Sequence, residues 1–155
     1  MAKRPMTLEG RELMEFLGFF FDQYMAEGKP VPPEVHPLKF VREMAERAPT
    51  RALLGLKMAV ADCIECSTHW HADQVKQADT ALRDAGIVTL SEMRRRYWKL
   101  FSAIIERGRI LSDQEYHLVK GVTSDGTVPP EQSALLDQLM NDYEAREGSR
   151  PTTTP

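Results

Sequence analysis

The sequence predicts an all-α protein: a single compact, bundle-like domain of about six or seven helices over residues 1–147, followed by a disordered tail over 148–155. Apolar residues recur at three- and four-residue steps along most of the chain, and no useful stretch alternates as a strand would. Residues typical of helix ends flank these segments. Hydroxyl side chains or prolines stand where helices begin, and glycines stand where they end. The 155 residues suffice for one domain with its own core.

A first helix is predicted between Thr7, whose hydroxyl can cap it, and Gly28, which ends it. Its apolar stripe comprises Leu13, Phe16, Leu17, Phe20, Phe21 and Tyr24. Phe19 lies outside the densest part of that stripe, so the helix has more apolar surface than one inner face needs. We therefore expect Phe16, Phe19 and Phe20 to contribute to an interface with a protein partner or a second copy of the chain.

After a proline-rich linker, Pro37 is expected to begin a second helix that ends before Pro49. Its expected inner residues are Leu38, Val41 and Met44. Thr50 is expected to cap a third helix, with a bend or break near residues 67–70. The stripe of the third helix comprises Leu53, Leu56, Val60, Cys63 and Ile64.

A fourth helix should bury Val75, Ala78 and Leu82 and end at Gly86. Capping boxes at Thr89–Glu92 and Ser112–Glu115 should open a fifth and a sixth helix. The fifth is expected to run unbroken to Gly108, with its arginines (Arg94, Arg95 and Arg96) directed to solvent and its apolar residues inward (Met93, Tyr97, Trp98, Phe101, Ile104 and Ile105). The sixth carries Tyr116, Val119 and Val122.

A last helix should follow Pro129 and Pro130, after which no apolar residue remains to be buried. Its apolar residues are Leu135, Leu136, Leu139, Met140 and Tyr143. Six residues at the centres of their stripes should be largely buried: Phe20, Leu56, Val60, Phe101, Ile104 and Leu139.

The overall charge argues against two classes of partner. The formal net charge is −3, whereas a protein that binds duplex nucleic acid usually concentrates basic residues. The apolar stretch over residues 16–21 is too short for a signal core or a membrane span. We therefore expect a cytoplasmic protein that binds neither nucleic acid nor membrane.

The segment DCIECSTHWH, residues 62–71, contains the side chains best suited to metal binding or thiol chemistry. Its Cys63 and Cys66 are the only cysteines, and His69 and His71 follow at once. Thiolate and imidazole are the ligands that zinc prefers, and these four residues give the required number if the helix breaks after Cys66. Zinc ligands more often come as two pairs separated by a longer loop, so the spacing is incomplete support for a zinc site.

Thiol chemistry is the second interpretation of the cysteine pair. A CxxC on a helix with a histidine shortly after it locally resembles the all-helical alkylhydroperoxidase D and carboxymuconolactone decarboxylase group. That resemblance covers only residues 63–71 and implies a peroxidatic or disulfide-exchanging thiol pair aided by a histidine. The chain departs from the pattern in two places: Trp70 occupies the position of the histidine, and Arg51 lies in the region where an acidic residue is usual.

The third interpretation is packing. Cys63 continues the apolar stripe that starts at Leu53, and free cysteines pack as small hydrophobic residues. No E-x-x-H, G-x-S-x-G or phosphate-binding loop is present. We therefore predict a protein that is not an enzyme and acts by macromolecular interaction, with redox or zinc chemistry at Cys63, Cys66, His69 and His71 as the alternative.

Overall fold

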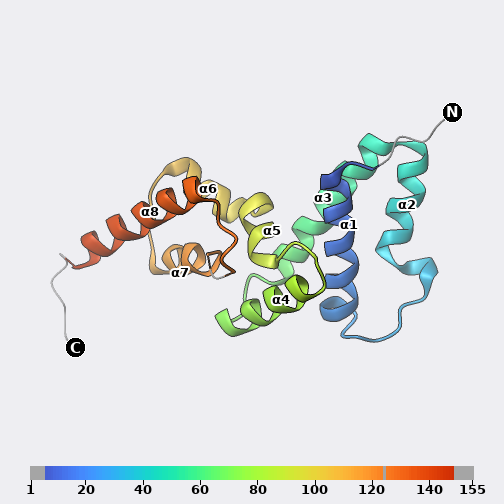
Figure 1. Ribbon diagram of the computed structural model, residues 1–155, viewed down its shortest axis with the longest axis horizontal. Helices are drawn as coiled ribbons and strands as arrows, with labels where there is room; N and C mark the ends of the chain where they lie inside the picture. Colours follow the sequence, from blue (N-terminus) through green and yellow to red (C-terminus); the bar gives the residue numbers. More distant parts are fainter. Residues whose placement is uncertain (1–5, 124, 149–155) are drawn as a thin grey trace.

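The computed structural model describes residues 6–123 and 125–148, and all regular structure within these residues is helical (Figure 1). The predicted all-α class is therefore confirmed. Residues 149–155, which make up all but the first residue of the predicted tail, lie outside the described part. Among the described helices, none combines the length and apolar character needed to cross a bilayer.

The N-terminal end of the molecule is built from three α-helices: α1 (Leu8–Phe20), α2 (Pro37–Arg47) and α3 (Pro49–Cys66). A π-helical turn, η1 (Phe21–Met25), continues α1, and a short 3₁₀ turn, η2 (Pro33–Val35), precedes α2. The two helices α1 and α2 approach closely at Gly18. A Cβ atom there would lie 2.8 Å from Leu38 Cδ1, so glycine is what allows Leu38 to pack directly on the α1 backbone.

The remaining helices are α4 (Ala72–Asp84), α5 (Leu90–Tyr97), α6 (Lys99–Arg107), α7 (Asp113–Gly121) and α8 (Pro130–Gly148). Figure 1 shows an elongated arrangement, with α1–α3 at one end, α6–α8 at the other, and α4 and α5 between them. One buried cluster nevertheless extends from Leu13 in α1 to Tyr143 in α8. All six residues predicted as core centres are at most 4% exposed.

The predicted helix caps are formed by the expected side chains. Thr7 Oγ1 accepts a hydrogen bond from Gly10 N (3.1 Å), Thr89 Oγ1 from Glu92 N (3.2 Å) and Ser112 Oγ from Glu115 N (3.2 Å). Gly108 ends α6 with a φ of 74°, a backbone conformation that favours glycine.

Three local predictions were wrong. Helix α3 begins at Pro49 with Ala48 as its cap, so Thr50 lies within the helix. Met44, predicted to face inward, is 42% exposed. The predicted fifth helix is broken at Trp98, whose ψ of 116° leaves the helical region and separates α5 from α6. Met93 and Phe101, on either side of the break, both lie in the core.

Candidate functional site

The cysteine pair lies in the last turn of α3, and its two thiols have different surroundings. Cys63 is 1% exposed, and its Sγ lies 3.8 Å from Met25 Sδ, so η1 covers it. Cys66 is the last residue of α3 and is exposed. The pair therefore consists of one sulfur in the core and one at the surface, one helical turn apart.

Burial raises the pKa of the Cys63 thiol to about 12, and the electrostatic interactions with Cys66 and Asp62 act in the same direction. The carboxyl end of a helix also disfavours an anion, because its carbonyl groups carry partial negative charge. Cys63 is therefore a neutral thiol at neutral pH, in a position that suits the packing interpretation.

The two histidines lie beyond the helix end and are both exposed. His69 is in the turn after α3, and His71 is the N-cap of α4, where its N–H donates to Gln74 Oε1 at 2.9 Å. Within residues 6–123 and 125–148, no three His, Cys, Asp or Glu side chains are arranged to hold a metal ion. The fold thus uses His71 to begin a helix.

Two of the arginines predicted to face solvent are instead buried. Arg94 is 5% exposed and Arg95 7% exposed, and only Arg96 of the three lies toward the surface. Because a buried guanidinium requires hydrogen-bond acceptors around it, each of the two has a distinct set of partners. Together these partners connect α5 with the end of α3 and with the segment that follows α7.

Arg94 fixes the chain directly after the cysteines. Its Nη2 donates to Ser67 O at 2.6 Å and to Ser67 Oγ at 2.9 Å, while Ser67 Oγ donates to Ile64 O at 2.7 Å. The guanidinium also lies 4.5 Å from the centre of the Trp98 ring. A cation at the end of α3 complements the helix dipole. Burial lowers the pKa of Arg94 to about 10, which leaves it charged at neutral pH.

Asp79 of α4 accepts two hydrogen bonds from Ser91, one from the backbone N at 2.9 Å and one from Oγ at 2.5 Å. Burial raises the pKa of Asp79 despite these bonds, and the nearby charge of Asp125 raises it further. The carboxylate therefore joins α4 to the first turn of α5.

Arg95 and Asp125 form the second buried set. Arg95 Nη1 lies 3.1 Å from Asp125 Oδ1, and the same guanidinium also donates to Val122 O and Thr127 Oγ1. Asp125 additionally accepts from the Thr89 hydroxyl and from Thr127 N at 3.1 Å. Although burial raises the pKa of Asp125, the hydrogen bonds from Thr127, Thr89 and Arg95 outweigh it and leave the pKa lowered.

The residues predicted as an interface are only partly at the surface. Phe16 and Phe20 are fully buried, and they stack with ring centres 5.5 Å apart. Phe19 is half-buried and packs against the core. Of the three, only Phe19 has surface to offer a partner, because the other two lie within the contact of α1 with the rest of the fold.

Exposed apolar residues lie elsewhere on the same end of the molecule. Ten large hydrophobic residues are exposed in the described part of the chain, and seven of them fall between residues 8 and 58: Leu8, Met25, Val35, Phe40, Met44, Leu54 and Met58. Met44 was predicted to face inward, and none of the other six was predicted to form a surface. The available signal was spacing: Phe40, and the i,i+4 pair Leu54 and Met58, lie outside the predicted inner stripes of their helices.

No known protein family matches the chain, and neither the curated proteins nor the solved structures contain a significant match.

Proposed function

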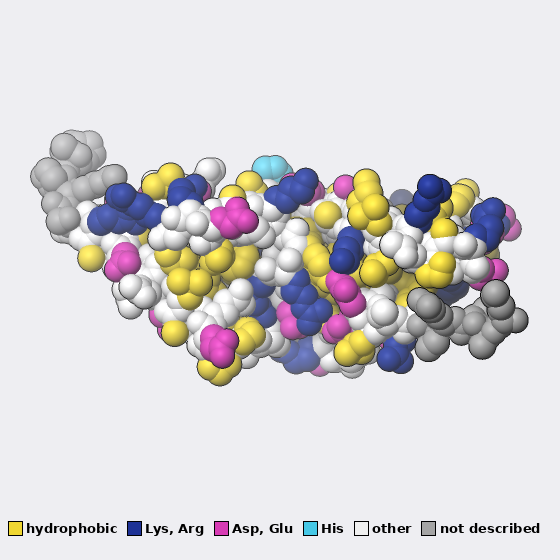
Figure 2. Space-filling view, turned by 90° about the horizontal axis from the view of Figure 1, so that it is seen from above, with side chains coloured by type: hydrophobic (Ala, Val, Ile, Leu, Met, Phe, Trp, Pro, Cys, Tyr) yellow, Lys and Arg dark blue, Asp and Glu magenta, His cyan; other side chains and the backbone are white. Residues whose placement is uncertain are grey.

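We propose that the protein acts by binding another protein through the outer surface of α1–α3. The observation that carries this proposal is the exposure of four large apolar side chains on adjoining helices: Phe40 at 60% and Met44 at 42% on α2, and Leu54 at 61% and Met58 at 63% on α3. Figure 2 shows hydrophobic side chains interspersed with charged ones at this end of the molecule, and others toward the opposite end. Exposed apolar groups gathered in one region are typical of a binding surface.

The start of α1 extends the α3 part of this surface. The Lys57–Glu9 ion pair, with Nζ and Oε1 3.3 Å apart, brings the first turn of α1 next to the outer face of α3. Leu8, the neighbour of Glu9, is 66% exposed. Exposed apolar residues, Leu8 and Met58, are therefore next in sequence to the two members of this ion pair. In such an interface the charges can orient a partner, and the apolar side chains supply the buried area.

Charge substitution tests this proposal without disturbing the core. The double variant Leu54→Glu/Met58→Glu changes only exposed side chains, and Leu100→Glu/Leu135→Glu is the matched control at the opposite end, where both residues are also exposed. We expect wild type and control to associate, either as dimers in sedimentation equilibrium or with the same proteins in affinity capture. The α3 variant should lose that association. The proposal would be refuted if the wild type were monomeric and the α3 variant captured the same proteins as the wild type.

Thiol–disulfide exchange is the second candidate, and the exposure of Cys66 one helical turn from Cys63 supports it. An exposed Cys66 can attack a disulfide substrate, forming a mixed disulfide and releasing one thiol. Cys63, one turn earlier on α3, would then attack the Cys66 sulfur, release the second thiol and leave a Cys63–Cys66 disulfide. This reaction requires η1 to uncover Cys63, since Met25 lies against it. Reduction of a disulfide substrate by wild type but not by Cys66→Ser would support this candidate.

A further inference from the structure

A cavity at the opposite end of the molecule carries an inference separate from the apolar surface. It has a volume of about 340 Å³ and is lined by Gly108, Arg109, Leu139, Asp142 and Arg146. The first two residues follow α6, and the other three lie at successive positions along one side of α8. Cavities that hold small molecules begin at about 300 Å³, so the space suits a compact ligand.

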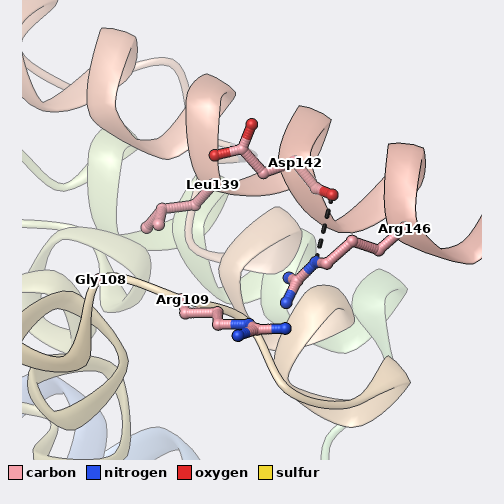
Figure 3. Close-up of a pocket in the computed structure, with 5 residues that line it drawn as sticks. All are labelled: Gly108, Arg109, Leu139, Asp142 and Arg146. Atoms are coloured by element: carbon pink, nitrogen blue, oxygen red, sulfur yellow. Dashed lines mark hydrogen bonds between the residues drawn. The ribbon is translucent and has the colours of Figure 1, made fainter.

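Two guanidinium groups face this cavity from different elements. Figure 3 shows the side chains of Arg109 and Arg146 extending toward the same space, while the Asp142 carboxylate is turned away from them. Arg146 is held in place because its Nη2 donates to Ile110 O at 2.7 Å and its Nε to Asp142 O at 3.3 Å. Arg109 makes no ion pair or side-chain hydrogen bond with the described residues.

The lining selects the class of ligand. Guanidinium groups match carboxylate and phosphate oxygens in shape and charge. The two arginines and Asp142 give the lining a formal net charge of one positive unit, which a carboxylate neutralises and a doubly charged phosphate exceeds. Leu139 contributes an apolar wall. We propose that this cavity binds a small organic carboxylate, with its head on Arg109 and Arg146 and a short apolar chain against Leu139.

The test is a titration of the full-length protein with hexanoate, followed by amide NMR shifts and calorimetry. Hexanol, which has the same chain without the charge, and inorganic phosphate are the comparison ligands. We expect saturable hexanoate binding that shifts the Gly108 amide, with at least about tenfold weaker binding of hexanol and of phosphate. Tighter binding of phosphate would overturn the choice of carboxylate, and the absence of saturable hexanoate binding would overturn the site.

Two substitutions locate the binding. Arg109→Gln should weaken hexanoate binding at least about tenfold, because the residue supplies the guanidinium that lacks a protein partner. Arg42→Gln, an exposed arginine on α2, is the matched control for overall charge and should bind like wild type. Asp142→Asn should tighten binding, since it removes a negative charge from the lining. If wild type and Arg109→Gln bound hexanoate equally well, the carboxylate would bind at another surface, and the proposal would be overturned.

Discussion

Arg95 Nη1 and Asp125 Oδ1 lie 3.1 Å apart with their side chains 3% and 0% exposed, so α5 and the segment after α7 share a buried ion pair. The pair thus joins the middle of the molecule, where α5 lies, to the segment between α7 and α8. Hydrogen bonds from Thr89 and Thr127 add to the ion pair, so the buried carboxylate of Asp125 has protein partners at both oxygens.

Replacing Arg95 with Met should destabilise the protein by about 3–5 kcal/mol, because the Asp125 carboxylate would remain buried without its cation. Urea unfolding followed by circular dichroism measures the change in the free energy of unfolding. Arg42→Met, at an exposed position, is the control and should stay within about 0.5 kcal/mol of wild type. A loss below about 1 kcal/mol for Arg95→Met would show that the pair contributes little.

Thr89→Ala should cost more than Ser112→Ala, although both remove a helix N-cap. The Ser112 cap is exposed, and its loss should cost about 1 kcal/mol. Thr89 Oγ1 also donates to Asp125, so its removal leaves a buried acceptor with one partner fewer and should cost about 2–3 kcal/mol. Unfolding free energies of the two variants, measured under the same conditions, give the comparison. Equal costs would mean that the Thr89–Asp125 bond adds nothing to the cap.

Asp79→Asn should gain stability relative to wild type as the pH rises. Burial raises the folded pKa of Asp79 above its ordinary value of 3.8, so its protonated form is the one that the fold favours. Its contribution to stability is complete below the unfolded pKa and is lost as the pH rises through the folded pKa. Asn keeps an acceptor for Ser91 N and never ionises. Urea titrations between about pH 3 and pH 7 should show the difference widening, and a constant difference would contradict the sign.

Native protein should react with a thiol reagent at Cys66 alone. Cys66 is exposed, whereas the Cys63 thiol is 1% exposed and has its pKa raised to about 12. Labelling with a maleimide at pH 7, followed by mass spectrometry, should give one adduct on wild type and on Cys63→Ser, and none on Cys66→Ser. In denaturant the wild type should take up two. Rapid modification of Cys63 in the native state would show that η1 opens.

The sequence determined the helical class, most helix ends and the core, because these depend on neighbours close along the chain. The caps at Thr7, Thr89 and Ser112 need only a hydroxyl three residues from an unpaired N–H, and the stripe through Phe101 and Ile104 follows from helical period. The end of α3 before the Ser67–Trp70 turn was likewise predictable.

Tertiary structure alone decided which polar residues would be buried and which apolar residues exposed. Arg94 and Arg95 are buried because Ser67 and Asp125, 27 and 30 residues away along the chain, supply their acceptors. Likewise, a helical stripe shows which side of a helix faces the core, but it does not show how much of that side the neighbouring helices cover. Phe16 and Phe20 are therefore enclosed, whereas Met44, which was predicted to face inward, remains 42% exposed. Contacts between distant segments set the burial of the two arginines and the exposure of Met44, which the helical period by itself does not determine.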